Sequence, residues 1–117
     1  MQSPPPGAHE VLRTTLADTN GVVAIVSDVV VPPNGALPRH FHPGEELVYI
    51  IDGSSVYVED GKPDLLLKTG DVYAIPPRTV HAPRGGPEGA RAISIRIIRE
   101  GEQEYVFLND NEAAPGE

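Results

Sequence analysis

The residues in this sequence best suited to chemistry are histidines, and two of the four lie together in the segment H-F-H. His40 and His42 have the same parity as Glu46. Because the side chains of a strand alternate between its faces, an extended segment would project these three to one side, although a Pro-Gly pair interrupts strict alternation. Glu45 has the opposite parity and is the weaker ligand candidate. Two imidazoles and one carboxylate form a ligand set suited to a borderline divalent ion.

The same residues also fit a simpler interpretation, in which a pair of surface histidines lies beside an acidic turn. The short pattern alone does not choose between a metal site and this alternative. The chain contains no cysteine, which excludes disulfides, thiolate nucleophiles and cysteine-bound metals. Any metal site must therefore be built from histidines and carboxylates.

Short apolar runs separated by turn residues predict that β-strands position these side chains. No segment carries a 3.6-residue period over ten or more residues, and turn residues recur about every 8–12 positions, which is typical of a sandwich or barrel. A turn is expected at residues 51–54 and a loop at 85–89. The expected strands cover residues 11–16, 21–31, 47–51, 55–59, 65–68, 72–75, 92–99 and 105–108.

Length and charge narrow the class of protein further. A chain of 117 residues is long enough for one domain. Its net charge of −8 argues against nucleic-acid binding, and no apolar run reaches the ~20 residues of a membrane helix. Residues 1–8 are expected to form a flexible Pro-rich arm, residues 9–108 one barrel domain and residues 109–117 a flexible acidic tail. The expected location is the cytoplasm, or the periplasm or exterior if this chain is the mature form of an exported protein.

Two longer segments resemble the paired signatures of the cupin superfamily. Residues 35–53 read G-A-L-P-R-H-F-H-P-G-E-E-L-V-Y-I-I-D-G, with the Gly, H-x-H, Glu and Gly of the first signature. Residues 70–81 read G-D-V-Y-A-I-P-P-R-T-V-H, with the Gly, Pro and His of the second. Three positions depart from the pattern: Gly35 lies one residue too close to H-x-H, Arg78 replaces a Gly, and Gly85 replaces an Asn.

The resemblance implies both a fold and a ligand set. The fold is an all-β double-stranded β-helix, a jelly-roll barrel of two packed antiparallel sheets. The implied ligands of one divalent metal ion per chain (Fe, Mn, Ni, Zn, Co or Cu) are His40, His42, Glu46 and His81. Two adjacent coordination positions would stay open for water, substrate or dioxygen. The resemblance also implies a small-molecule ligand inside the barrel and a homodimer, which would cover open strand edges.

Three further residues are candidates for roles beside the metal. Tyr73 lies on the strand that leads to the His81 turn and is the first candidate for hydrogen bonding or proton transfer, although filling core space is the simpler role for a tyrosine. Glu45 is the second candidate for proton transfer. Arg78, on the loop before His81, could bind a substrate carboxylate or could be a solvated loop charge.

The resemblance favours a mononuclear, dioxygenase-like metalloenzyme that acts on a small organic substrate. Relatives with this ligand set also include oxalate-degrading enzymes, sulfoniopropionate lyases and isomerases of sugar-derived acids. A lyase or isomerase acting on a small sugar acid or carboxylate is therefore an alternative, and a non-catalytic module that holds a metal or small ligand is another. The sensor half of a regulator is disfavoured, because no helix-turn-helix segment accompanies the barrel.

Overall fold

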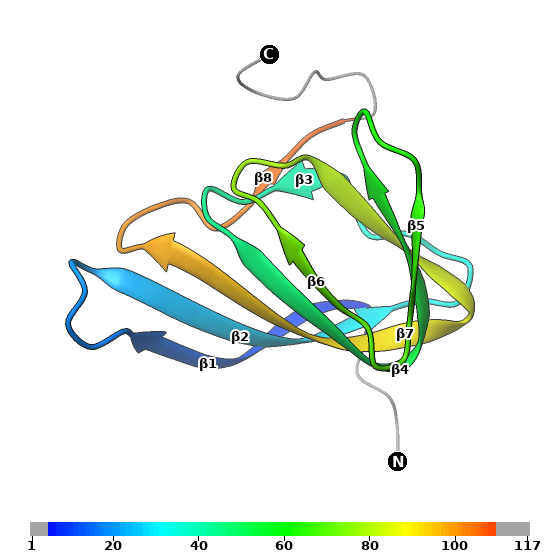
Figure 1. The fold of residues 1–117 in the computed structure, drawn as a ribbon, viewed down its shortest axis with the longest axis horizontal. Coiled ribbons are helices and arrows are strands. Elements are labelled where there is room, and N and C mark those ends of the chain that lie inside the picture. The colour runs from blue at the N-terminus through cyan, green and yellow to red at the C-terminus, as the bar shows by residue number, and fades with distance from the viewer. Residues whose placement is uncertain (1–4, 110–117) are drawn as a thin grey trace.

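The computed structural model describes residues 5–109, and within this range the chain forms strands joined by turns, with no helix (Figure 1). The expected all-β fold is confirmed. None of the described residues forms a helix that could span a membrane. The strands are β1 (Gly7–Thr15), β2 (Val22–Val31), β3 (His40–Phe41), β4 (Glu46–Glu59), β5 (Leu65–Lys68), β6 (Val72–Ile75), β7 (His81–Arg99) and β8 (Val106–Phe107).

The strands pair antiparallel in one sheet that curls over on itself (Figure 1). β7 pairs with β2, β3 and β4, and β1 continues the sheet beyond β2. β4 also pairs with β6 through its first residues and with β5 through its later ones. The two packed sheets expected from the sequence are therefore two halves of one continuous sheet, because the long strands β4 and β7 run through both.

The two longest strands contain the residues at which the sequence predicts breaks. The predicted turn at residues 51–54 is wrong, since these residues lie inside β4, and the predicted loop at 85–89 lies inside β7. The β4–β7 register shifts twice around Gly53, so the strand bends at bulges without leaving the sheet. Gly53 has a φ of 74°, a left-handed conformation that glycine adopts without steric cost.

Two clusters of buried apolar side chains form the interior. The larger one joins the inward-facing positions of β4, β5, β6 and β7, and the smaller one joins β2 to the end of β7. Ile25 in the smaller cluster and Ile50 in the larger are 0% and 2% exposed. The larger cluster consists of Ile50, Tyr57, Leu67, Ile75 and Ala92, and it forms part of the wall of the cavity described below.

The ends of the barrel differ slightly from the expected domain limits. β1 begins at Gly7, inside the range expected for the N-terminal arm, and Gly7 pairs with Val30 of β2. Residues 1–4 and 110–117 lie outside the described residues. The predictions of a flexible arm and a flexible acidic tail fall largely on those residues and stay predictions.

Candidate metal centre

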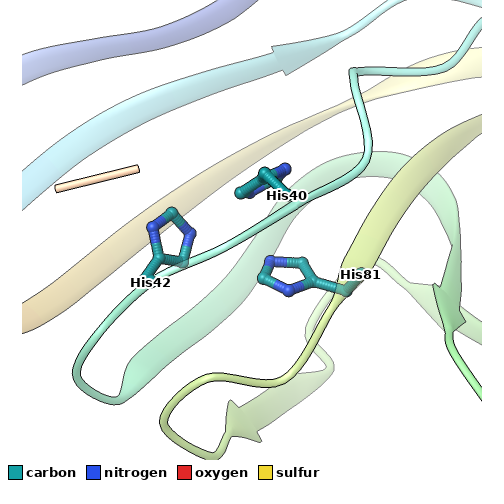
Figure 2. Close-up of side chains that lie close together, drawn as sticks. All are labelled: His40, His42 and His81. Carbon is teal, nitrogen blue, oxygen red and sulfur yellow. The ribbon is translucent and has the colours of Figure 1, made fainter. Parts of the chain in front are cut away.

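Three buried histidines come together from two distant parts of the chain. His40 begins β3, His42 directly follows it, and His81 begins β7 as the cross-strand partner of His40. One ring nitrogen from each lies within 4.8 Å of the other two, and Figure 2 shows the three rings close together. Their exposed fractions are 8%, 3% and 3%. The simpler interpretation, a pair of surface histidines, is therefore wrong.

A close contact between the H-P-G-E turn and β7 positions the segment that follows the histidines. The Ile97 N–H donates to the Glu45 carbonyl at 2.9 Å, which ties the turn to the sheet. A Cβ atom on Gly44 would lie 1.6 Å from the Ile97 carbonyl oxygen, so only glycine fits at this position. This glycine lets the chain turn tightly enough for Glu46, at the start of β4, to face the histidines.

Glu46 lies against two of the three imidazoles. Its Oε1 is 3.1 Å from His42 Nε2 and 3.3 Å from His81 Nε2. Its other oxygen, Oε2, accepts a 2.5 Å hydrogen bond from the buried Ser94 hydroxyl. Glu46 does not belong to the group of atoms within 4.8 Å of one another, which is formed by the histidines alone. It nevertheless presents one free carboxylate oxygen to the same space.

Backbone carbonyls fix the orientation of each imidazole. The Nδ1 atoms of His40, His42 and His81 lie 2.6, 2.8 and 2.8 Å from carbonyl oxygens. Because a carbonyl can only accept, each Nδ1 must carry the hydrogen, which leaves Nε2 of the neutral ring with a free lone pair. The carbonyl oxygen beside His40 is that of Pro38, the one beside His42 is that of Glu104, and the one beside His81 is that of Thr79. This arrangement is the one by which proteins orient histidines that bind metals.

The buried acceptors of this cluster have no donor among the described residues. His42 Nε2 and Glu46 Oε1 face each other, and neither has a hydrogen-bond partner. Two buried lone pairs at 3.1 Å are unfavourable unless a cation or a proton lies between them. The cluster of His40, His42, Glu46 and His81 therefore fits a divalent metal ion.

The electrostatics of the cluster keep its members in the states that a metal requires. Burial, and then the charge of His81, lowers the pKa of His40 to about 4. Burial would raise the pKa of Glu46, but a proton on His42 or His81, donated to its carboxylate and adding positive charge, outweighs burial and holds that pKa below its usual value. At neutral pH, His40 is neutral and Glu46 ionised, as metal ligands must be.

A cavity of about 350 Å³ opens beside the cluster. Its volume is at the low end of the range for small-molecule sites, which is about 300–1,000 Å³. All four members of the cluster line it. The rest of the lining is mainly apolar and aromatic, with Val29, Val31, Leu37, Pro38, Val48, Ile50, Tyr57, Leu67, Tyr73, Ile75, Pro83, Tyr105 and Phe107 as its larger side chains.

Of the three other residues predicted to act at the site, one lines the cavity and two do not. Tyr73 lines the cavity, and its ring centroid lies 4.7 Å from that of Tyr57. Glu45 is exposed and is not a lining residue. Arg78 is also exposed and does not line the cavity. Its backbone N–H donates to the His42 carbonyl, and its φ of 59° is the left-handed conformation that the Gly typical of this motif position takes readily.

Sequence reasoning missed several residues that touch the site. The Tyr105 ring lies 4.9 Å from the His42 ring. Ser94 and Glu104 hold the cluster through hydrogen bonds. The alternation A-I-S-I-R could have indicated Ser94 as inward-facing, since it shares the parity of Ala92. No local signal marks Glu104 or Tyr105, which follow the last long strand.

A family model places the barrel in a known group of proteins. Residues 27–96, which include all four members of the cluster, match the model described as a cupin domain. The chain belongs to the cupin family. A search of curated proteins found no match.

Solved structures of other cupins resemble this chain. A cupin-like protein from Thermotoga maritima is 34% identical, with a TM-score of 0.66, over 73% of this chain and 64% of that one. The DMSP lyase DddQ from Ruegeria pomeroyi is 27% identical, with a TM-score of 0.61, over 76% of this chain and 44% of that one. This cupin thus spans less than two thirds of either relative.

A third structure supports the fold alone. An RmlC-like cupin from Methanocaldococcus jannaschii, described as a double-stranded β-helix, has a TM-score of 0.70 at 11% identity. The match covers 83% of this chain and 84% of that one. The double-stranded β-helix expected from the two signatures is confirmed.

Proposed function

We propose that this cupin is a mononuclear metalloenzyme in which His40, His42, Glu46 and His81 hold one divalent ion beside a small organic substrate. One observation carries the proposal: buried lone pairs, without donors, face one another in the wall of a mainly apolar cavity. A structural role for the cluster would be satisfied by hydrogen bonds within it. An ion held there supplies Lewis acidity and positions for oxygen ligands.

The chain's own residues supply binding and proton transfer. The apolar wall excludes water from the substrate, which strengthens electrostatic interactions at the histidine end. Tyr73 is the candidate for proton transfer, because it lines the cavity and its hydroxyl forms no hydrogen bond with another described residue. Glu45 is not retained in that role, since its exposed side chain lies outside the lining.

Dioxygenase-like chemistry is the first candidate reaction, and a lyase reaction is the second. The similarity to the DMSP lyase DddQ supports the second candidate. An enzyme that binds carboxylates usually provides an arginine, and no arginine or lysine is among the described residues that line the cavity. This lining weighs against the sugar acids and carboxylates considered from the sequence. A module that holds an ion without turnover is the remaining alternative.

Metal analysis followed by activity screening tests the proposal. Protein prepared without an affinity tag is expected to contain one divalent ion per chain. It is then screened for oxygen uptake with flavonols, diketones and small acids, and for product formation without oxygen. Oxygen uptake with one substrate class supports the dioxygenase, and oxygen-independent bond cleavage supports the lyase. Absence of stoichiometric metal under every loading condition would overturn the proposal, and metal without turnover of any compound supports the non-catalytic module.

A further inference from the structure

The cavity is divided into one polar corner and one long apolar wall. The polar corner consists of the cluster of His40, His42, Glu46 and His81, together with Ser94. The wall is built on the larger core cluster, against which Val29, Val48 and Tyr73 also pack. All eight of these wall residues line the cavity.

Among the described residues of the wall, the Tyr73 hydroxyl is the one polar side-chain group left free for a ligand. The Ser55 hydroxyl already donates to the Arg84 carbonyl at 3.1 Å, and the Tyr57 hydroxyl donates to Glu59 at 2.8 Å. Among the described residues that line the cavity, Glu46 is the only one with a side chain charged at neutral pH, histidines aside. A ligand charge placed against this wall would have no charged partner.

Arginines near the cavity are already paired elsewhere. Arg96 is 3% exposed, and its guanidinium lies 4.4 Å from the centroid of the Tyr105 ring. It pairs with Glu104 at 3.3 Å and is not a lining residue, whereas Tyr105 is. Arg39 forms an ion pair with Asp60. Neither side chain contributes positive charge to the wall.

We infer that the ligand of this cavity is a compact molecule with one polar head, which faces the histidines, and an uncharged apolar or aromatic body, which packs on the wall. The inference rests on the proposed function, because the head is the part that meets the metal. The volume of about 350 Å³, at the low end of the range for small-molecule sites, favours a compact ligand. A buried charge without a partner is costly, so molecules with a charged far end are excluded. Aromatic side chains at both Tyr57 and Tyr73 favour a ring as the body.

Three phenols that differ only at the far end test this inference. They are 4-ethylphenol, 4-hydroxyphenylacetate and tyramine, which keep the same head and carry a neutral, an anionic and a cationic tail. Each is titrated by calorimetry into zinc-loaded protein at pH 7.5. We expect 4-ethylphenol to bind at least about tenfold more tightly than either charged analogue. Equal or tighter binding of a charged analogue would overturn the inference.

Chelated protein separates this inference from the proposed function. Removal of zinc is expected to weaken 4-ethylphenol binding while preserving the order of the three phenols, since the wall residues bind no metal. Failure of the protein to take up stoichiometric zinc or any other divalent ion would overturn the proposed function alone. Stoichiometric zinc, combined with 4-ethylphenol binding that chelation leaves unchanged, would overturn the placement of the head.

A matched pair of variants tests the role of the wall directly. Val29→Lys places a cation on the wall, and Val29→Met places a neutral side chain of similar length there. Val29→Lys should favour 4-hydroxyphenylacetate over 4-ethylphenol, whereas Val29→Met should keep the order of the native protein. If both variants keep the native order, the wall does not select the ligand. Should Val29→Lys fail to fold, the three titrations of the native protein still decide the inference.

Discussion

Each imidazole of the cluster is held in one orientation before any ion binds. The Nδ1 hydrogen of His42 is donated to a carbonyl 62 residues away, and those of His40 and His81 to carbonyls two residues away. All three Nε2 atoms are therefore directed by the backbone rather than by contacts with one another. A site whose donors are already oriented loses little conformational entropy when the ion arrives.

Replacing His81 by Ala should remove the metal without unfolding the barrel. The variant loses one of four donors, so its metal content, measured by elemental analysis, should fall well below one ion per chain. His9→Ala is the matched control, because His9 is hydrogen-bonded to the Pro5 carbonyl and does not line the cavity. It should keep full metal content. Stoichiometric metal in the triple variant that lacks His40, His42 and His81 would contradict the assignment of the ligands.

The metal-free protein should become less stable as the pH falls from about 6.5 to 4. The pKa of His40 is about 4 in the folded chain and 6.5 in the unfolded one. In this window the unfolded chain binds a proton that folded His40 does not, so the free energy of unfolding decreases, by about 3 kcal/mol in total. Above pH 6.5 this contribution is fully present. The lowered pKa of Glu46 adds a further loss below its usual value of 4.5.

Bound metal should delay this acid destabilisation. Because the ion competes with protons for the imidazoles, the melting temperature should stay high to a lower pH and then fall steeply as the ion is released. Added metal should also raise the melting temperature at neutral pH by mass action. The measurement is a series of melting curves from pH 8 to 4.5 with and without chelator. Superimposable curves would contradict a buried metal site.

At the scale of elements, the sequence predicts short strands better than long ones. β5 and β6 match the predicted strands at residues 65–68 and 72–75. Alternation and bounding turns are local signals, and they suffice for these strands. β4 is divided in the prediction and β7 is reduced to its second half, residues 92–99. The Gly and Pro residues that usually end a strand lie here within strands whose pairing resumes after a shift in register. Such pairing is a tertiary effect that a single sequence does not show.

The residues of the candidate site follow the same rule: those marked by a local pattern could be predicted, and those that depend on tertiary contacts could not. The four members of the cluster, which are candidate ligands, were predictable because fixed spacings within residues 35–53 and 70–81 carry them. The residues that orient the ligands were not, since Glu104 meets His42 only after the chain has crossed the barrel. Parity placed Glu45 correctly on the opposite side from Glu46. It could not place Arg78, whose left-handed backbone breaks the alternation.

The segment after β7 is held over the site by Glu104. Its carboxylate pairs with Arg13 of β1 at 2.6 Å and with Arg96 of β7 at 3.3 Å. Its carbonyl accepts the Nδ1 hydrogen of His42, and the next residue, Tyr105, lies against the same ring. The side chain of Glu104 therefore holds in place the backbone that orients His42.

Glu104→Ala should weaken metal binding although Glu104 is not itself a ligand. Loss of the two ion pairs frees the segment, so the backbone carbonyl that alanine keeps orients His42 less well. Complete loss of such an outer partner typically costs about 10–100-fold in metal affinity, which is the upper limit expected here. Affinity is measured by competition with a chelator of known strength. Glu100→Ala removes the same charge from a neighbouring exposed position and should leave the affinity unchanged. Equal affinities in both variants and the native protein would show that the segment does not position His42.

At the scale of the whole molecule, the barrel has an apolar outer face. Leu47, Tyr49 and Ile51 alternate with cavity-lining residues of β4 and are 40%, 47% and 40% exposed. Tyr49 is the cross-strand partner of Val72 in β6, which is 68% exposed, and of Ile93 in β7. A continuous exposed apolar patch of this kind typically marks an interface between proteins.

We expect this patch to pair two copies of the chain into a homodimer, because a twofold axis brings the same apolar surface of both copies together. Sedimentation or light scattering of the native protein should then give about twice the chain mass of 12.5 kDa. Tyr49→Arg puts a charge into the centre of the patch, where burial without a partner is costly, and should yield monomers with the barrel intact. Gln103→Arg makes the same change of charge at an exposed position after β7 and should stay dimeric. A native particle of 12.5 kDa at micromolar concentration would contradict the dimer, and a dimer that survives Tyr49→Arg would move the interface to another face.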